Sequence, residues 1–153
     1  MTAFLRVAIY AVIVLTVWLI LPRTSKADET WLVATVRSYH YTRGVSGRCE
    51  DNYGLGVEHH VSSDWSLSAG GYKNSFCERS YYAGVGWFPL HYGNWHYGVN
   101  TGLVTGYERN DPAGFLVVGV TYQEKNWGVN VGVVPSLDHP FTVIGLQLKA
   151  RFR

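Results

Sequence analysis

The chain has 153 residues and a formal net charge of +2, with 13 lysine and arginine residues against 11 aspartate and glutamate residues. This length suits one domain and hardly two, and so small a charge gives no electrostatic reason to expect a nucleic-acid partner. The two cysteines are not in a CxxC spacing, and the adjacent His59 and His60 would point to opposite faces of a strand. We therefore expect no metal site.

Residues 1–27 have the pattern of a signal peptide. Arg6 precedes an apolar run at residues 7–21, and Ser25 and Ala27 stand at the −3 and −1 positions of a cleavage site after Ala27. Cleavage would remove three basic residues and no acidic one, which leaves 10 basic against 11 acidic residues and a formal charge of −1. We predict export with cleavage. An uncleaved signal anchor is the alternative, although the run is shorter than the about 20 residues of a membrane-spanning helix.

The rest of the chain alternates between apolar residues and small or polar ones, which is the pattern of β-strands. After the leader, no segment shows a sustained helical period. The pattern predicts eight strands, at residues 31–41, 53–61, two within 65–87 on either side of a polar tip, 95–107, 115–122, 127–133 and 142–152. Eight strands of roughly nine to eleven residues match the smallest bacterial membrane barrels.

One face of these strands is apolar, whereas the other is rich in Gly, Ser and Asn. The apolar face has aromatic residues at strand ends, namely Trp65, Trp87, Trp95, Tyr107, Trp127 and Phe152, and we expect Tyr39, Tyr41, Tyr81 and Tyr82 in the same girdle or at the rim. Aromatic girdles are typical of a lipid-facing wall, and a closed barrel leaves no unpaired edge in lipid. We predict an all-β fold, an eight-stranded antiparallel transmembrane β-barrel of the outer-membrane type at residues 28–153, in the cell outer membrane. A soluble lipocalin-like barrel is the alternative.

Strand order predicts which connections share an end of the barrel. With both termini in the periplasm, the connections after the first, third, fifth and seventh strands lie outside. His40 then lies near the outer end of the first strand, and Asn74 and Ser75 lie at the outer end of the third. Cys49 and Cys77 fall in the first and second outer loops, so we predict that they form a disulfide. Such a cross-link would remove on the order of 3–4 kcal/mol of unfolded-state entropy.

Residues 72–75 (YKNS), followed by residues 83–87 (AGVGW), resemble without a gap the PagP-type family of outer-membrane lipid A palmitoyltransferases. The resemblance runs from the His40 region to the end of the chain. It implies an eight-stranded barrel with an acyl pocket in its outer half, and a reaction that moves a palmitoyl chain from a phospholipid to lipid A without a cofactor. The family has a His on the first strand where this chain has His40, and the glycine at the floor of its acyl pocket corresponds to Gly86.

The resemblance implies roles for three residues at the outer rim. His40 would be the general base and Ser75 the hydroxyl that it activates, with residue 74 orienting the imidazole. The family has Asp where this chain has Asn74, and a neutral amide cannot stabilise an imidazolium as a carboxylate does. Asn could instead orient the His as it does in papain-like enzymes, or donate to an oxyanion.

Two functional hypotheses follow. The first is an acyltransferase-like monomeric barrel that acts on membrane lipids, phospholipid and lipid A, with His40, Asn74 and Ser75 catalytic and Gly86 binding the acyl chain. The second is a non-catalytic small outer-membrane barrel with a structural or surface-interaction role. Asn74 in place of the acid motivates the second, as does the lack of room before the first strand for the amphipathic helix with which the family begins.

Overall fold

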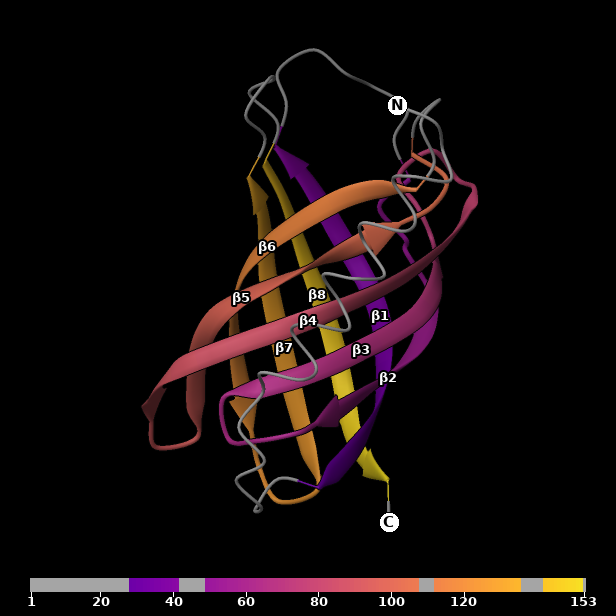
Figure 1. Ribbon diagram of the computed structural model, residues 1–153. Helices are drawn as coiled ribbons and strands as arrows, with labels where there is room; N and C mark the ends of the chain where they lie inside the picture. The colour runs from indigo at the N-terminus through magenta and orange to yellow at the C-terminus, as the bar shows by residue number, and fades with distance from the viewer. Residues whose placement is uncertain (1–27, 42–48, 108–111, 136–141, 153) are drawn as a thin grey trace, which may run out of the picture.

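The computed structural model describes residues 28–41, 49–107, 112–135 and 142–152, and these form eight β-strands (Figure 1). The strands are β1 (Glu29–Tyr41), β2 (Gly54–His60), β3 (Trp65–Lys73), β4 (Arg79–Tyr92), β5 (Trp95–Val104), β6 (Ala113–Gln123), β7 (Trp127–Pro135) and β8 (Thr142–Phe152). The predicted signal peptide and its cleavage after Ala27 lie outside the described residues. Within the described ranges, no helix is long and apolar enough to cross a membrane.

The eight strands close into one antiparallel barrel, which confirms the predicted fold. Each strand pairs with its neighbours in sequence, and the seam between β1 and β8 runs from Thr30 opposite Phe152 to Tyr41 opposite Thr142. Figure 1 shows β8 ending beside the start of β1. We call the end of the barrel at which β1 begins and β8 ends the termini end, and the opposite end the loop end. As predicted, β1, β3, β5 and β7 all end at the same end of the barrel, the loop end.

Several strand boundaries differ from those predicted: β4 runs on to Tyr92, past the predicted limit at residue 87, β6 and β7 are slightly longer than predicted, and β2 is one residue shorter at each end. β1 begins at Glu29, two residues earlier, because residues 29 and 30 also find ladder partners in the neighbouring strands. β5 ends at Val104, three residues earlier than predicted. The reason lies at Gly106, whose φ of 80° is a left-handed backbone conformation that a strand does not contain.

The outer surface of the wall is apolar, and the inner surface is small or polar. Among the described residues, the buried hydrophobic side chains are Trp31, Val33 and Val104. Exposed large hydrophobic side chains include Leu32, Leu55, Val57, Leu116, Val118, Val131, Ile144, Leu146, Leu148 and Phe152. A soluble barrel has the opposite arrangement, with its apolar set inside. The wall is therefore built to face lipid, and the lipocalin-like alternative is wrong.

Aromatic rings gather on the strands near the termini end. Trp65 and Trp87 are register partners on β3 and β4, and their rings stack with centroids 5.9 Å apart. Around the wall, the ring of Tyr122 lies 4.9 Å from that of Trp95 and 5.6 Å from that of Trp127. Such a belt is what the interface between hydrocarbon and water favours, because these rings are apolar and carry a polar group.

Tyr82, predicted at the girdle or rim, lies instead inside the barrel. Its ring is 6.0 Å from that of Tyr72, which also points inward. Glycines on the facing strands make room for it: a Cβ on Gly56 would lie 2.5 Å from the Tyr82 hydroxyl, and one on Gly70 would lie 2.9 Å from its ring. Because Gly56 and Gly70 have no side chain, they leave space inside the barrel into which the ring of Tyr82 fits.

One irregularity in β1 decides which face His40 occupies. The register with β8 shifts between Thr35 and Arg37, so β1 carries an extra residue there, a β-bulge. Before the bulge the odd-numbered Trp31 is buried inside the barrel; after it the odd-numbered Tyr39 is 57% exposed. The even positions, His40 among them, therefore turn to the inner face only because of the bulge.

Polar side chains form a network inside the barrel toward the termini end. The carboxylate of Glu58 accepts hydrogen bonds from Nζ of Lys149 at 2.7 Å and lies 2.6 Å from Nε2 of His60. Lys149 also lies over the ring of Trp31, 5.1 Å from its centroid. The amide of Asn130 extends the network to the far side of the carboxylate at 3.5 Å. Each buried charge thus has an opposite charge and further polar partners, which is the condition for burying it.

We expect Lys149→Met to lower the free energy of unfolding by about 3–5 kcal/mol, because the substitution leaves the Glu58 carboxylate buried without its cation. The double variant Glu58→Gln/Lys149→Met should recover most of that loss, since no buried charge then remains unpaired. Urea unfolding of the protein in lipid vesicles, followed by tryptophan fluorescence, measures both values.

The pair Arg151–Glu29 supplies the matched control. Its nitrogen and oxygen are 2.8 Å apart, against 2.7 Å in the interior pair, but its side chains are 32% and 26% exposed. Arg151→Met should therefore cost at most about 1 kcal/mol. If Lys149→Met lowered the free energy of unfolding no more than Arg151→Met does, the interior pair Glu58–Lys149 would contribute no more to stability than the more exposed pair.

Candidate functional site at the loop end

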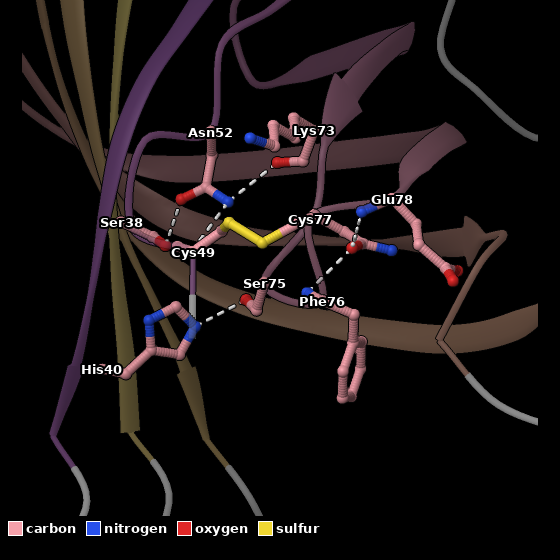
Figure 2. Close-up of a disulfide and its surroundings, with 10 residues drawn as sticks. Ser38, His40, Cys49, Asn52, Lys73, Ser75, Phe76, Cys77 and Glu78 are labelled. Carbon is pink, nitrogen blue, oxygen red and sulfur yellow. Dashed lines mark hydrogen bonds between the residues drawn. A yellow bond between two sulfur atoms is a disulfide. The ribbon is translucent and has the colours of Figure 1, made fainter. Parts of the chain in front are cut away.

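At the loop end, His40 and Ser75 lie side by side (Figure 2). His40 is the last residue but one of β1, and Ser75 follows β3 in the connection to β4. Nε2 of His40 is 2.5 Å from Oγ of Ser75, and Ser75 is buried. The two residues are 35 positions apart in sequence, so barrel closure and the β1 bulge together create the contact.

A disulfide joins the two loops beside this pair. Cys49 and Cys77 are bonded, with their Cα atoms 5.4 Å apart, which confirms the predicted disulfide. The N–H of Cys49 donates to the carbonyl of Ser75, and the N–H of Cys77 donates to the carbonyl of Asn74, each at 3.0 Å. Cys77 has a φ of 67°, which is uncommon for a residue with a side chain. The cross-link and these bonds hold the backbone that carries Ser75.

Asn52, which no pattern in the sequence singled out, ties β1 to the end of β3. Its Oδ1 accepts a hydrogen bond from the hydroxyl of Ser38, and its Nδ2 donates to the carbonyl of Lys73 at 2.8 Å (Figure 2). The side chain is almost fully buried. Asn52 therefore fixes the distance between the strand that carries His40 and the loop that carries Ser75. An asparagine three residues after a loop cysteine is too common a pattern to reveal this role.

Asn74 organises the turn that presents Ser75. Its Oδ1 accepts from the backbone N–H groups of Phe76 at 2.9 Å and Glu78 at 3.0 Å. Its Nδ2 donates to Oγ of Ser80 at 2.9 Å and to the carbonyl of Gly106 at 2.8 Å. The side chain is fully buried, and the two backbone donors fix which way the amide points. None of these four bonds reaches the imidazole that Asn74 was predicted to orient.

Gly86 lies inside the barrel toward the termini end, opposite Ser66 of β3. A Cβ at this position would lie 2.5 Å from Oγ of Ser66 and 2.7 Å from Oδ1 of Asn100, so side chains fill the space over the glycine. From Ser66 the chain runs nine residues to Ser75, roughly 30 Å along an extended strand. The structure thus brings together His40, Ser75 and the Asn74 backbone, and leaves Gly86 near the opposite end.

The other histidines of the described part of the chain lie toward the termini end. His60 contacts Glu58 in the interior network, and His59 is bonded to the hydroxyl of Thr30 at 3.0 Å. The rings of His91 and His96 are 4.5 Å apart. Within residues 28–41, 49–107, 112–135 and 142–152, no group of three His, Cys, Asp or Glu side chains is placed to hold a metal ion.

The pair at the loop end has the geometry of a nucleophile and its general base. A serine hydroxyl within hydrogen-bond distance of an imidazole nitrogen can pass its proton to that nitrogen as its oxygen attacks an electrophile. The surrounding disulfide, Asn52 and Asn74 hold the serine side of the pair in one place. Such a pair can carry out nucleophilic catalysis, of which acyl transfer is one form.

Comparison with known proteins supports the fold. No protein-family model matches the sequence, and no curated protein matches it. A de novo designed transmembrane β-barrel is similar, with a TM-score of 0.61 and 14% identity over 84% of this chain and 98% of the design. The N-terminal β-barrel domain of OprF from Pseudomonas aeruginosa has a TM-score of 0.55 and 15% identity over 82% of this chain and 98% of that domain. The chain therefore has the fold of an outer-membrane-type barrel, and neither likeness bears on the resemblance to the PagP-type family.

We expect Asn74→Asp to lower the free energy of unfolding by roughly 1–3 kcal/mol. One carboxylate oxygen can keep the two backbone donors, but the other would face the carbonyl oxygen of Gly106 with no N–H to offer it. Urea unfolding in vesicles measures the change.

The same exchange at Asn94 is the matched control. The amide of Asn94 also donates, to Oε1 of Glu124 at 2.8 Å, but this residue is exposed in the turn between β4 and β5. Because water replaces the lost bond there and screens the new carboxylate from that of Glu124, Asn94→Asp should cost less than about 1 kcal/mol. Equal losses at the two positions would show that the buried amide of Asn74 has no special part in the turn.

Proposed function

We propose that this protein is an outer-membrane acyltransferase-like barrel that moves an acyl chain from a phospholipid to lipid A, as in the PagP-type family that its sequence resembles. The observation that carries the proposal is the 2.5 Å contact between Nε2 of His40 and Oγ of Ser75. The resemblance assigns catalytic roles to these two positions, and the contact supports those roles without relying on it. The apolar outer wall supports a location in the outer membrane.

In the proposed reaction, His40 takes the proton of Ser75 as the serine oxygen attacks the ester carbonyl carbon of the donor phospholipid. The tetrahedral intermediate collapses with cleavage of the ester C–O bond, and the departing lysophospholipid oxygen takes the proton from the imidazole. A hydroxyl of lipid A then attacks the acyl-serine, gives its proton to His40, and the serine oxygen recovers that proton as it leaves. Each half-reaction breaks one ester bond and forms one, so no cofactor is needed.

Asn74 and Gly86 have narrower roles in this proposal than the sequence suggested. Asn74 is a positioning residue, because its amide shapes the turn that carries Ser75. Gly86 serves as the floor of an acyl pocket only if the side chains of Ser66 and Asn100 move aside when lipid binds.

A second candidate function is a non-catalytic small barrel with a structural or surface-interaction role. The filled space over Gly86 favours it, because the PagP-type reaction places an acyl chain there. In that case the contact between His40 and Ser75 would serve only to close the rim of the barrel.

We expect wild-type protein expressed in a Gram-negative host to add a C16 chain to lipid A or to a phospholipid. His40→Ala should reduce the rate by roughly 10²–10⁴-fold, because the hydroxyl loses its general base. Ser75→Ala should reduce it to background, because the nucleophile is gone. Mass spectrometry of outer-membrane lipid extracts measures all three.

Matched controls lie at the termini end of the same barrel. Ser63→Ala and His91→Ala remove a serine and a histidine on either side of Asp64, remote from the proposed pair, and should leave the products unchanged. Heat-modifiable mobility on gels verifies that each variant folds. A wild type that produces no lipid with an added acyl chain would leave the second candidate; full activity in Ser75→Ala would exclude an acyl-serine.

A further inference from the structure

Two cations face each other at the loop end of the β3–β4 hairpin. Lys73 is the last residue of β3, Arg79 is the first of β4, and they are direct register partners. Both side chains are exposed. Both residues belong to the odd-numbered positions of the hairpin, the set that includes the outward-facing Tyr81 and Trp87. The pair therefore stands on the outer wall and not in the lumen.

Neither cation has an acidic partner among the described residues, although other cations of the barrel do. Arg37 lies 3.5 Å from a carboxylate oxygen of Glu50, and Lys149 has its carboxylate inside the barrel. Like charges directly opposite on neighbouring strands repel and destabilise the pairing. An anion bound between Lys73 and Arg79 would replace this repulsion with attraction to both cations and so stabilise the strand pairing.

The height of the pair on the wall indicates where such an anion would come from. The outward column below it descends through Tyr81 to the stacked Trp65 and Trp87, register partners near the termini end. Eight residues of β3 separate Trp65 from Lys73, which is roughly 26 Å along the strand and roughly 20 Å in height at the usual tilt. The hydrocarbon band of such barrels is about 25 Å tall. The backbone of the pair thus lies about 5 Å short of the outer edge of this band. The long side chains of Lys73 and Arg79 can span that distance to the lipid headgroups.

We propose that Lys73 and Arg79 bind the phosphomonoester headgroup of a membrane lipid. Two adjacent cations match a phosphomonoester, which carries nearly two negative charges near neutral pH and three acceptor oxygens. The backbone of the site is fixed, because the carbonyl of Lys73 is bonded to Asn52 and its N–H to the carbonyl of Tyr53. This inference rests on the proposed function for its use: Lys73 lies two residues before Ser75 in the chain, on the outer wall of the rim whose inner side carries His40 and Ser75, so a lipid held there would lie at the same rim as the reactive pair.

The test measures binding and not turnover, so that it does not depend on acyl transfer. The full chain is extracted from membranes into neutral maltoside micelles and titrated with dioleoyl phosphatidic acid by microscale thermophoresis. Dioleoylglycerol, which has the same chains without phosphate, and inorganic phosphate are titrated in parallel. Wild type should bind phosphatidic acid more tightly than either. Lys73→Gln and Arg79→Gln should each weaken it roughly fivefold, the contribution of one cation at an anionic membrane surface.

Two further variants separate this site from the proposed reaction. Lys125→Gln removes an exposed cation in the turn between β6 and β7, at the termini end, and should leave binding unchanged. Ser75→Ala should also bind normally, whether or not the wild type transfers acyl chains. The inference is overturned if the double variant Lys73→Gln/Arg79→Gln binds as wild type does, or if dioleoylglycerol binds equally well. If inorganic phosphate binds as tightly as phosphatidic acid, the site does not recognise a lipid. If Ser75→Ala loses binding, Lys73 and Arg79 do not form the binding site by themselves, and the inference is overturned as well.

Discussion

The pairing of β8 with β1 is the constraint on which the rest of this structure depends. In a wall whose outer face is apolar, an unpaired strand edge would leave backbone N–H and C=O groups in lipid without partners. Closure removes that edge from Thr30 to Tyr41. It also divides every strand into residues that face lipid and residues that face the interior, so between irregularities of the register the polarity of each side chain follows the two-residue alternation. The small and polar residues inside and the exposed leucines and valines outside are two consequences of the same seam.

Closure alone would turn His40 outward, and the β1 bulge is what turns it inward. A single extra residue between Thr35 and Arg37 exchanges the faces of all later residues of the strand. Bulges are frequent beside functional sites for this reason, since they re-aim a side chain without changing the strand order. The contact with Ser75 is therefore a product of barrel topology and one local irregularity acting together.

Much of this architecture could be predicted from the sequence. The two-residue period gave eight strands, and their order placed Cys49 and Cys77 in neighbouring loops at one end, where the disulfide forms. The β1 bulge could not be predicted, because it shows only in the register with β8, more than 100 positions later. The bond from Asn74 to the carbonyl of Gly106 could not be predicted either, because it depends on a left-handed glycine in another loop. The two-residue alternation is local and predicts where strands lie, whereas the β1 bulge and the contact of Asn74 with Gly106 depend on segments that are distant in the sequence.

Asn74 stands where the PagP-type family that the sequence resembles has an acid, and its contacts give this difference a structural reason. As the third member of a catalytic triad, Asn74 would be less effective than an aspartate, because a neutral amide does not stabilise an imidazolium. In this barrel it accepts from two backbone N–H groups and donates to a carbonyl, and a carboxylate cannot do both. An acid at this position would need a different partner in place of the Gly106 carbonyl. The amide and the surrounding loop are therefore one coupled feature, and in the proposed function the chemistry relies on His40 and Ser75, with no carboxylate at position 74.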